Sequence, residues 1–171
     1  MKKHFLVLLT IFASSFLLFA QGKNILPSEK NCLTIEQNQF SLDTVKDSSI
    51  IMLNIWGTFC SPSIKEMPDL QLLQNQYGTE KLQIIGIPVD VTDFKGNIKS
   101  KKLNSALDIV KTTGVKYPNL VPTKSMLSGF LSDVQVVPTT IFIDKNGKQL
   151  GETYYGSRTK EQWQKIVDSL L

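Results

Sequence analysis

The sequence predicts an α/β domain with a central mixed β-sheet flanked by helices, from three observations. A near-continuous apolar run at Ile50–Trp56 is typical of a strand buried on both faces. An amphipathic segment follows it, and a second apolar run at Leu82–Val89 completes a strand-helix-strand unit. Further on, two strands joined through Asn146 and Gly147, a strong hairpin signal, lead into a last helix. This order of elements favours one mixed sheet with helices on both faces.

The other elements of the first half follow from local patterns. Cys32–Val45 mixes polar and apolar residues, and we interpret it as an N-terminal β-hairpin extension. Ser61–Tyr77 carries apolar residues every three positions and is expected to be helical, with a kink at Pro68. Leu103 to Val110 has the spacing of a crossover helix.

The second half is expected to hold a shorter helix at Ser125–Asp133 and strands at Thr139–Asp144 and Gln149–Tyr154. The last helix has an apolar face and begins with a capping box formed by Thr159 and Gln162.

The chain of 171 residues has the size of one domain behind a short leader. Phe5 to Ala20 is almost wholly apolar and follows a basic start, but it is shorter than the roughly 20 residues of a membrane-spanning helix. This pattern predicts a signal peptide over residues 1–22 and a folded domain over residues 23–171. We therefore expect export to a periplasm or to the extracytoplasmic face of the cell envelope. An uncleaved anchor is the alternative, and only such a leader would contact a membrane.

Composition narrows the possible chemistry. The formal charge of +4 falls to +2 when the two leader lysines are removed, and the only histidine, His4, leaves with them. A mature chain without imidazole excludes Ser-His-Asp and Cys-His catalysis and histidine metal sites. Lysines gather at residues 95–102 without interleaved aromatics, which favours a solvated loop over a nucleic-acid site. We expect neither a metal nor another cofactor.

Cys60 lies at the junction between the first buried strand and the long helix. Backbone N–H groups and the helix dipole stabilise a thiolate at such a position. Pro62 suits an early helical position because its φ is fixed and it has no N–H. We therefore interpret Cys60 as a reactive thiol rather than an inert buried one.

Two motifs give the chain a family resemblance over about Cys32 to Leu171. The first resembles Asn-Phe-Trp-Ala-x-Trp-Cys-x-Pro-Cys followed by Glu-x-Pro, and its matching positions are Asn54, Trp56, Cys60, Pro62, Glu66 and Pro68. The second is Val137-Pro138-Thr139-Thr140 with Ile143 to Gly147 after it. Together with the order of elements, they resemble the thioredoxin fold and its TlpA/ResA-type exported thiol–disulfide oxidoreductases, in the redoxin/AhpC-TSA superfamily.

Ser63 is the decisive departure from that family, because it stands where the second cysteine is expected. In a dithiol enzyme the second sulfur attacks the mixed disulfide and releases the product. A serine hydroxyl can do neither this nor form a disulfide. The resemblance therefore implies one nucleophile, Cys60, at a degenerate Cys-x-x-Ser site.

The resemblance also suggests roles for four neighbours of Cys60. It implies a cis peptide bond before Pro138, which would lie against Cys60, and a backbone at Val137 that pairs with substrate. Glu66 matches a family acid that influences proton transfers at the thiols, although a solvated helix residue is an equal alternative. Phe59 is expected to offer apolar contact to a substrate.

The sequence therefore predicts a monomeric thiol–disulfide exchange protein that acts on extracytoplasmic thiol or disulfide proteins with an external thiol reductant. A redox-inactive binding or chaperone-like module is the main alternative. A one-cysteine peroxidase is disfavoured, because Thr58 lies two rather than three positions before the cysteine and the only arginine is Arg158. Cys32 is expected to be too far from Cys60 for a disulfide, which needs Cα atoms within about 7 Å. The alternative is that the two meet, in which case Cys32 could replace the missing resolving thiol.

Overall fold

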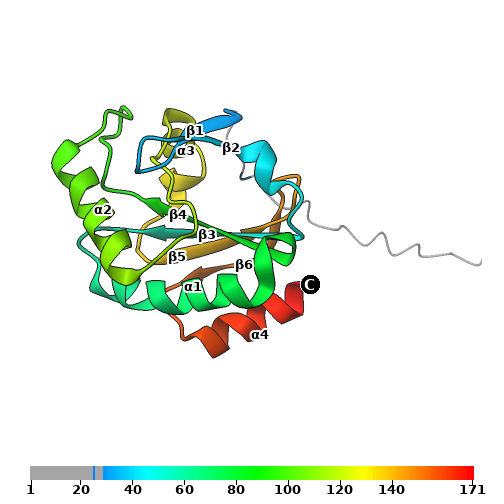
Figure 1. Ribbon diagram of the computed structural model, residues 1–171. Coiled ribbons are helices and arrows are strands. Elements are labelled where there is room, and N and C mark those ends of the chain that lie inside the picture. Colours follow the sequence, from blue (N-terminus) through cyan, green and yellow to red (C-terminus); the bar gives the residue numbers. More distant parts are fainter. Residues whose placement is uncertain (1–24, 26–28) are drawn as a thin grey trace, which may run out of the picture.

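The structure is a computed structural model that describes residues 25 and 29–171 (Figure 1). The signal peptide predicted over residues 1–22 lies outside the described residues. A four-stranded mixed sheet in the order β4-β3-β5-β6 forms the centre, which confirms the expected α/β architecture. Its strands are β3 (Ile50–Trp56), β4 (Leu82–Pro88), β5 (Thr139–Ile143) and β6 (Gln149–Tyr155).

The sheet is parallel on one side and antiparallel on the other. β3 pairs in parallel with β4, and the two are joined by α1 (Ser61–Lys81). β5 pairs antiparallel with both β3 and β6. In the β5–β6 turn, Asp144 accepts hydrogen bonds from the backbone N–H groups of Asn146 and Lys148, and Gly147 adopts a φ of 80°. The hairpin predicted from Asn146 and Gly147 is therefore confirmed.

Helical segments cover both faces of this sheet (Figure 1). One core cluster joins the sheet to α1, α2 (Ser100–Thr113) and α4 (Lys160–Leu170). The other joins it to α3 (Lys124–Ser128) and the 3₁₀ turns η1 (Leu42–Val45) and η2 (Phe130–Asp133). Side chains of β3 alternate between these clusters: Met52 faces α1, whereas Leu53 faces the other side. This alternation turns Asn54 toward α1.

The N-terminal hairpin is present but shorter than predicted. β1 (Asn31–Leu33) pairs antiparallel with β2 (Gln39–Ser41) in a small sheet of its own. The last part of the predicted hairpin is the turn η1 instead, because Ser41 caps it by accepting a hydrogen bond from the Asp43 N–H.

The predicted helix Ser61–Tyr77 ends where the backbone leaves helical geometry, at Gly78, with φ 67° and ψ 164°, and α1 resumes for three residues beyond it. The kink expected at Pro68, inside α1, stays a prediction. Another helix prediction needs correction. The single helix expected at Ser125–Asp133 is two short ones, since Gly129 between them has φ −98° and ψ −122°. The crossover helix and the capping box of Thr159 and Gln162 are confirmed.

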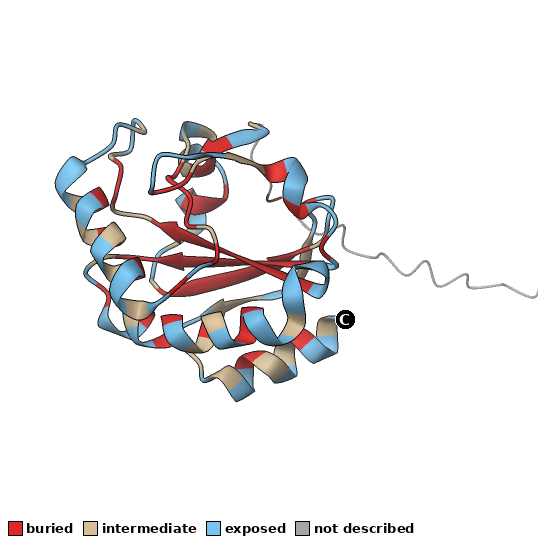
Figure 2. Ribbon diagram, viewed as in Figure 1, coloured by how far each residue is buried: buried red, intermediate tan, exposed pale blue. Residues whose placement is uncertain are grey.

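The strands of the sheet centre are the most buried part of the domain (Figure 2). Every residue of β3, β4 and β5 is buried, whereas β6 is partly exposed along its length. Within residues 25 and 29–171, no helix combines the length and the apolar character that crossing a membrane requires.

Candidate active site

Cys60 is the N-cap residue of α1, directly after the short loop that leaves β3. Pro62 occupies the first turn, as expected from its fixed φ. The cysteine is 9% exposed, and the side chain of the preceding residue, Phe59, is 67% exposed. The sequence thus places one thiol at the start of a 21-residue helix, next to the surface.

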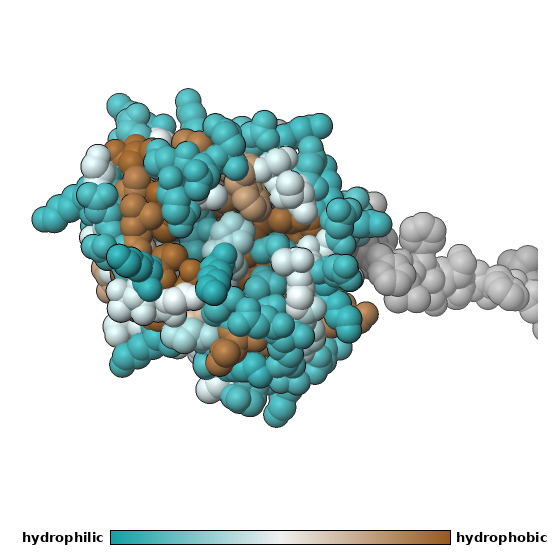
Figure 3. Space-filling view, in the orientation of Figure 1, coloured by the Kyte–Doolittle hydropathy of each residue, from teal (hydrophilic) through white to brown (hydrophobic). Residues whose placement is uncertain are grey.

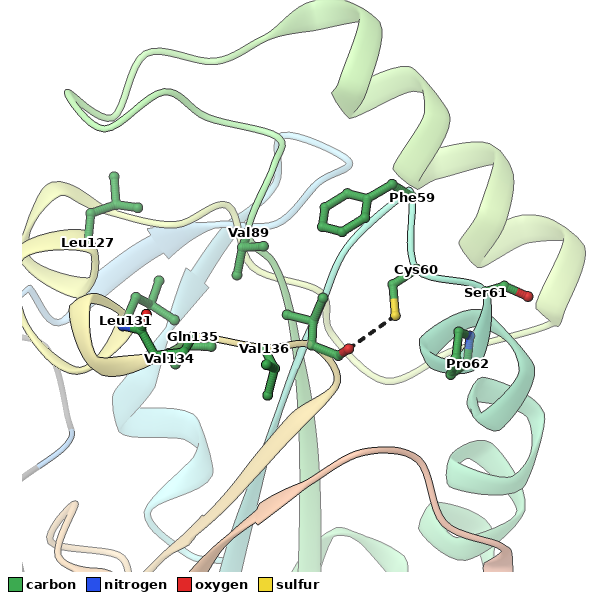
Figure 4. A pocket seen from close by; sticks show the side chains of 11 residues that line it. Phe59, Cys60, Ser61, Pro62, Val89, Leu127, Leu131, Val134, Gln135 and Val136 are labelled. Atoms are coloured by element: carbon green, nitrogen blue, oxygen red, sulfur yellow. Dashed lines mark hydrogen bonds between the residues drawn. The ribbon is translucent and has the colours of Figure 1, made fainter.

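The loop before β5 lies directly opposite this thiol. The peptide bond between Val137 and Pro138 is cis, which confirms the expectation drawn from the family resemblance. The Cys60 thiol donates a hydrogen bond of 3.2 Å to the carbonyl oxygen of Val137, drawn as the dashed line in Figure 4. Val136, beside it, is 52% exposed and Val137 is half-buried, so this loop lies at the surface.

A groove of about 790 Å³ opens beside the thiol. In Figure 4, Phe59 and Cys60 form one side of it, and Leu127 and Leu131 lie across from them. Most of its wall is apolar, and its lining also includes Ser61, Pro62, Val89, Val134, Gln135, Val136 and Val137. In the space-filling view, hydrophobic side chains likewise gather in a hollow between α2 and α3 (Figure 3). A groove of this size and lining is a candidate binding site for an apolar segment.

Ser63 lies on the inner side of α1 rather than in this groove. Its side chain is fully buried, and its hydroxyl oxygen has no hydrogen-bond partner among the described residues. Since a buried hydroxyl without a partner costs free energy, nothing in the packing favours serine over a less polar side chain here. The residue at the expected resolving position is therefore a buried hydroxyl with no hydrogen-bond partner among the described residues.

Glu66 is also buried, one turn further along α1, which rules out the alternative of a solvated helix residue. Asn54 donates to one carboxyl oxygen at 3.0 Å, while the backbone N–H of Arg158 and the indole of Trp163 donate to the other at 3.0 and 3.4 Å. Burial raises the pKa of the carboxyl, and these hydrogen bonds limit the rise. Glu66 thus links α1 to β3 and to the start of α4.

A second polar group supports the loop before Cys60. Asp90, just after β4, accepts hydrogen bonds from the backbone N–H and the hydroxyl of Thr58, at 3.0 and 2.5 Å. Lys102 of α2 forms an ion pair of 2.9 Å with Asp90 and lies 5.9 Å from the centre of the Phe59 ring. Burial works to raise the pKa of Asp90, but the contacts with Thr58 and Lys102 outweigh it and lower the pKa.

The other cysteine belongs to a different part of the domain. Cys32 lies in β1, is 3% exposed and packs in the core cluster on the face opposite α1. Both cysteines are free thiols in the structure, as expected. Burial, with a smaller contribution from the charge of Glu29, raises the pKa of Cys32 to about 11.

Three of the predicted site residues, Phe59, Cys60 and Val137, line the groove, and Pro138 follows the cis bond beside it. Ser63 and Glu66 are buried and do not line the groove. Across residues 25 and 29–171, no group of three or more His, Cys, Asp or Glu side chains is arranged to hold a metal ion.

Sequence reasoning missed the far wall of the groove and the support given by Asp90. A signal for the wall was present, because Leu127, Leu131 and Val134 recur at helical spacing. No comparable signal marked Asp90, which reaches Thr58 only because β4 lies beside β3.

The sheet order, the helix-capping cysteine and the cis-proline loop beside it define a thioredoxin-like protein. The chain belongs to the AhpC/TSA family, which matches residues 25–148. It is similar to "Thiol-disulfide oxidoreductase ResA" of Bacillus thuringiensis (strain Al Hakam), with 31% identity over 128 residues, which is 75% of this chain and 66% of that protein. It is also similar to "Thioredoxin-like protein YneN" of Bacillus subtilis (strain 168), with 27% identity over 79% of this chain and 72% of the relative.

Solved structures agree on the fold. A DsbF homologue from Corynebacterium diphtheriae has a TM-score of 0.63 and 31% identity, covering 84% of this chain and 85% of its own. A thiol:disulfide interchange protein of the thioredoxin family from Chlorobium tepidum TLS has a TM-score of 0.69 and 24% identity, covering 86% of this chain and 95% of its own.

Proposed function

We propose that this protein carries out thiol–disulfide exchange with Cys60 as its only nucleophile. The observation that carries the proposal is the position of this thiol, at the N-cap of α1 and open to an apolar groove. A helix N-terminus favours the thiolate, which is the form that attacks disulfides. The names of the similar proteins, a thiol-disulfide oxidoreductase and a thiol:disulfide interchange protein, support the same chemistry.

The reaction begins when the Cys60 thiolate attacks one sulfur of a client disulfide. A new S–S bond forms between Cys60 and that sulfur, the client's own S–S bond breaks, and its second sulfur leaves as a thiolate that takes a proton from water. The groove wall, including Leu127 and Leu131, would hold apolar residues of the client during this step. We expect the client segment to pair with the surface loop at Val136 and Val137.

The second half of the reaction needs a thiol from outside the chain, because Ser63 supplies a hydroxyl where a resolving sulfur is needed. When an external thiolate attacks the Cys60 sulfur, the client leaves as a thiolate and an external mixed disulfide remains on Cys60. A second external thiolate attacks the external sulfur of that disulfide, and Cys60 leaves as a thiolate. Two external thiols are thereby oxidised to a disulfide and the client disulfide is reduced by two electrons.

We further propose that this protein is exported and acts as a monomer, and that its clients are extracytoplasmic thiol or disulfide proteins. The basic start and apolar stretch before Gln21 support export, in a periplasm or at the outer face of the cell envelope. N-terminal sequencing of protein from the cell envelope tests this. A mature chain that begins near Gln21 or Lys23 is expected, and an intact Met1 would instead support a membrane anchor.

The exchange reaction is tested with three forms of residues 23–171: wild type, Cys60→Ser and Ser63→Cys. Each is mixed with an unfolded disulfide protein, separated by non-reducing electrophoresis and compared in a disulfide-reduction assay. We expect reducible adducts with wild type, none with Cys60→Ser, and faster turnover with Ser63→Cys, because attack within the chain gains effective molarity. If wild type forms no adduct and Ser63→Cys gains no activity, the protein is a thioredoxin-fold binding module instead.

A further inference from the structure

A second hollow adjoins the groove at the start of α1. It has a volume of about 420 Å³ and shares Ser61 and Pro62 with the lining of the groove. In Figure 4 the Ser61 side chain points away from the apolar wall formed by Leu127 and Leu131. A segment that passes over Ser61 and Pro62 would therefore reach from one hollow into the other.

The two hollows differ in chemistry. Where the groove beside Cys60 is largely apolar, the second hollow contains the cations Lys65 and Arg158 and the acids Glu66 and Asp69. Backbone N–H groups already engage both acids: that of Arg158 donates to Glu66 at 3.0 Å, and that of Lys160 donates to Asp69 at 3.1 Å. Among the described residues, neither Lys65 nor Arg158 forms an ion pair.

Arg158 is held in place although none of the described carboxylates lies within ion-pair distance of its guanidinium, and buried Glu66 interacts with its charge at longer range. Its Nη1 group donates to the carbonyl oxygens of Tyr155 and Gly156, at 3.2 and 3.1 Å. The guanidinium carbon lies 5.1 Å from the ring centre of Tyr154 and 5.0 Å from that of Trp163. These contacts restrain the Arg158 guanidinium, so binding a ligand costs little further side-chain entropy. The donors on Nη2 and Nε have no hydrogen-bond partner among the described residues.

We propose that Arg158, with Lys65 lining the same hollow, binds an acidic side chain of the client a few residues from the cysteine that reacts with Cys60. This rests on the proposed function and adds a substrate class to it: client segments with apolar residues on one side of the reactive cysteine and Asp or Glu on the other. A planar guanidinium with free donors matches a carboxylate in two parallel hydrogen bonds. Arg158 is the only arginine of the chain, so one substitution removes the guanidinium that we propose binds the carboxylate.

The test uses short peptides whose single cysteine carries a 2-thiopyridyl group, so that attack by Cys60 releases 2-thiopyridone. Paired peptides differ only by Glu or Gln, placed two to five residues before or after the cysteine. We expect one placement at which Glu reacts about three- to fivefold faster than Gln at low salt. High salt should reduce this ratio.

In Arg158→Met the Glu-to-Gln ratio should fall toward one, whereas Arg158→Lys should keep part of it because the charge remains. Lys145→Met, a lysine of the β5–β6 turn outside both hollows, serves as the matched control and should keep the full ratio. Near-UV circular dichroism verifies that each variant is folded.

Equal rates for Glu and Gln at every placement would overturn the inference and leave the exchange function standing. A preference that survives in Arg158→Met would overturn it too. If no peptide forms an adduct with wild type, the proposed function itself fails, and this inference fails with it.

Discussion

The two cysteines of this chain are both buried, but they lie in different kinds of surroundings. Cys32 is a strand residue inside an apolar core cluster, and its burial raises the pKa of the thiol to about 11. Cys60 begins a helix, donates to the Val137 carbonyl and borders a groove of about 790 Å³. Their exposed fractions, 3% and 9%, differ little. We therefore expect the reactivity of each thiol to depend on the element that holds the sulfur and on what lies in front of it.

The largest expected effect is a difference between the alkylation rates of the two cysteines. At pH 7, a thiol with the pKa of Cys32, about 11, is ionised in roughly one molecule in ten thousand. Iodoacetamide should therefore modify Cys60 at least about 100-fold faster than Cys32 in the native protein. Mass spectrometry of Cys60→Ser and Cys32→Ser over time gives the two rates separately. Rates in urea serve as the reference for the unfolded chain. If Cys60 and Cys32 are alkylated at equal rates in the native protein, the predicted difference between the two thiols is wrong.

A smaller effect is expected on stability at alkaline pH. The folded chain holds the Cys32 proton up to a pKa of about 11, whereas the unfolded chain releases it near 8.5. Between these values the native state binds more protons, so the free energy of unfolding falls as pH rises. Urea denaturation at pH 8 and pH 10 should show a loss of up to about 2 kcal/mol from this group. Cys32→Ala should lack that share of the loss, and an unchanged loss in this variant would contradict the burial argument.

The smallest effect concerns Ser63, three positions after Cys60. Because its buried hydroxyl has no partner among the described residues, Ser63→Ala should raise the free energy of unfolding by about 1 kcal/mol. Ser61→Ala, at an exposed position of the same turn, is the matched control and should change it by less than about 0.5 kcal/mol. Chemical denaturation measures both. A clear loss of stability in Ser63→Ala would mean that the hydroxyl has a partner after all.

Much of the fold was predictable because its signals are local. β3 is a continuous apolar run, the last hairpin has Asn146 and Gly147, and α4 begins with its capping box, so each was found from a few neighbouring residues. One helix error arose at a glycine. Gly129 divides a helical pattern that the apolar spacing alone would continue.

The site was predictable only in part, because its parts come from distant segments. Cys60 and the cis bond before Pro138 follow from motifs, but their contact joins residues 77 positions apart. The burial of Glu66 depends on Asn54, Trp163 and the Arg158 backbone, which the fold brings together. The hollow around Arg158 has no motif of its own.

The lifetime of one adduct tests most directly the claim that Cys60 acts without a resolving group. Wild type and Ser63→Cys are each loaded with a fluorescent peptide as a mixed disulfide on Cys60, freed of excess thiol, and followed by peptide release. We predict that the wild-type adduct persists until an external thiol is added, whereas Ser63→Cys releases its peptide unaided and forms an internal disulfide. Release from wild type without added thiol, at a rate like that of Ser63→Cys, would contradict the account and assign the resolving role to another group.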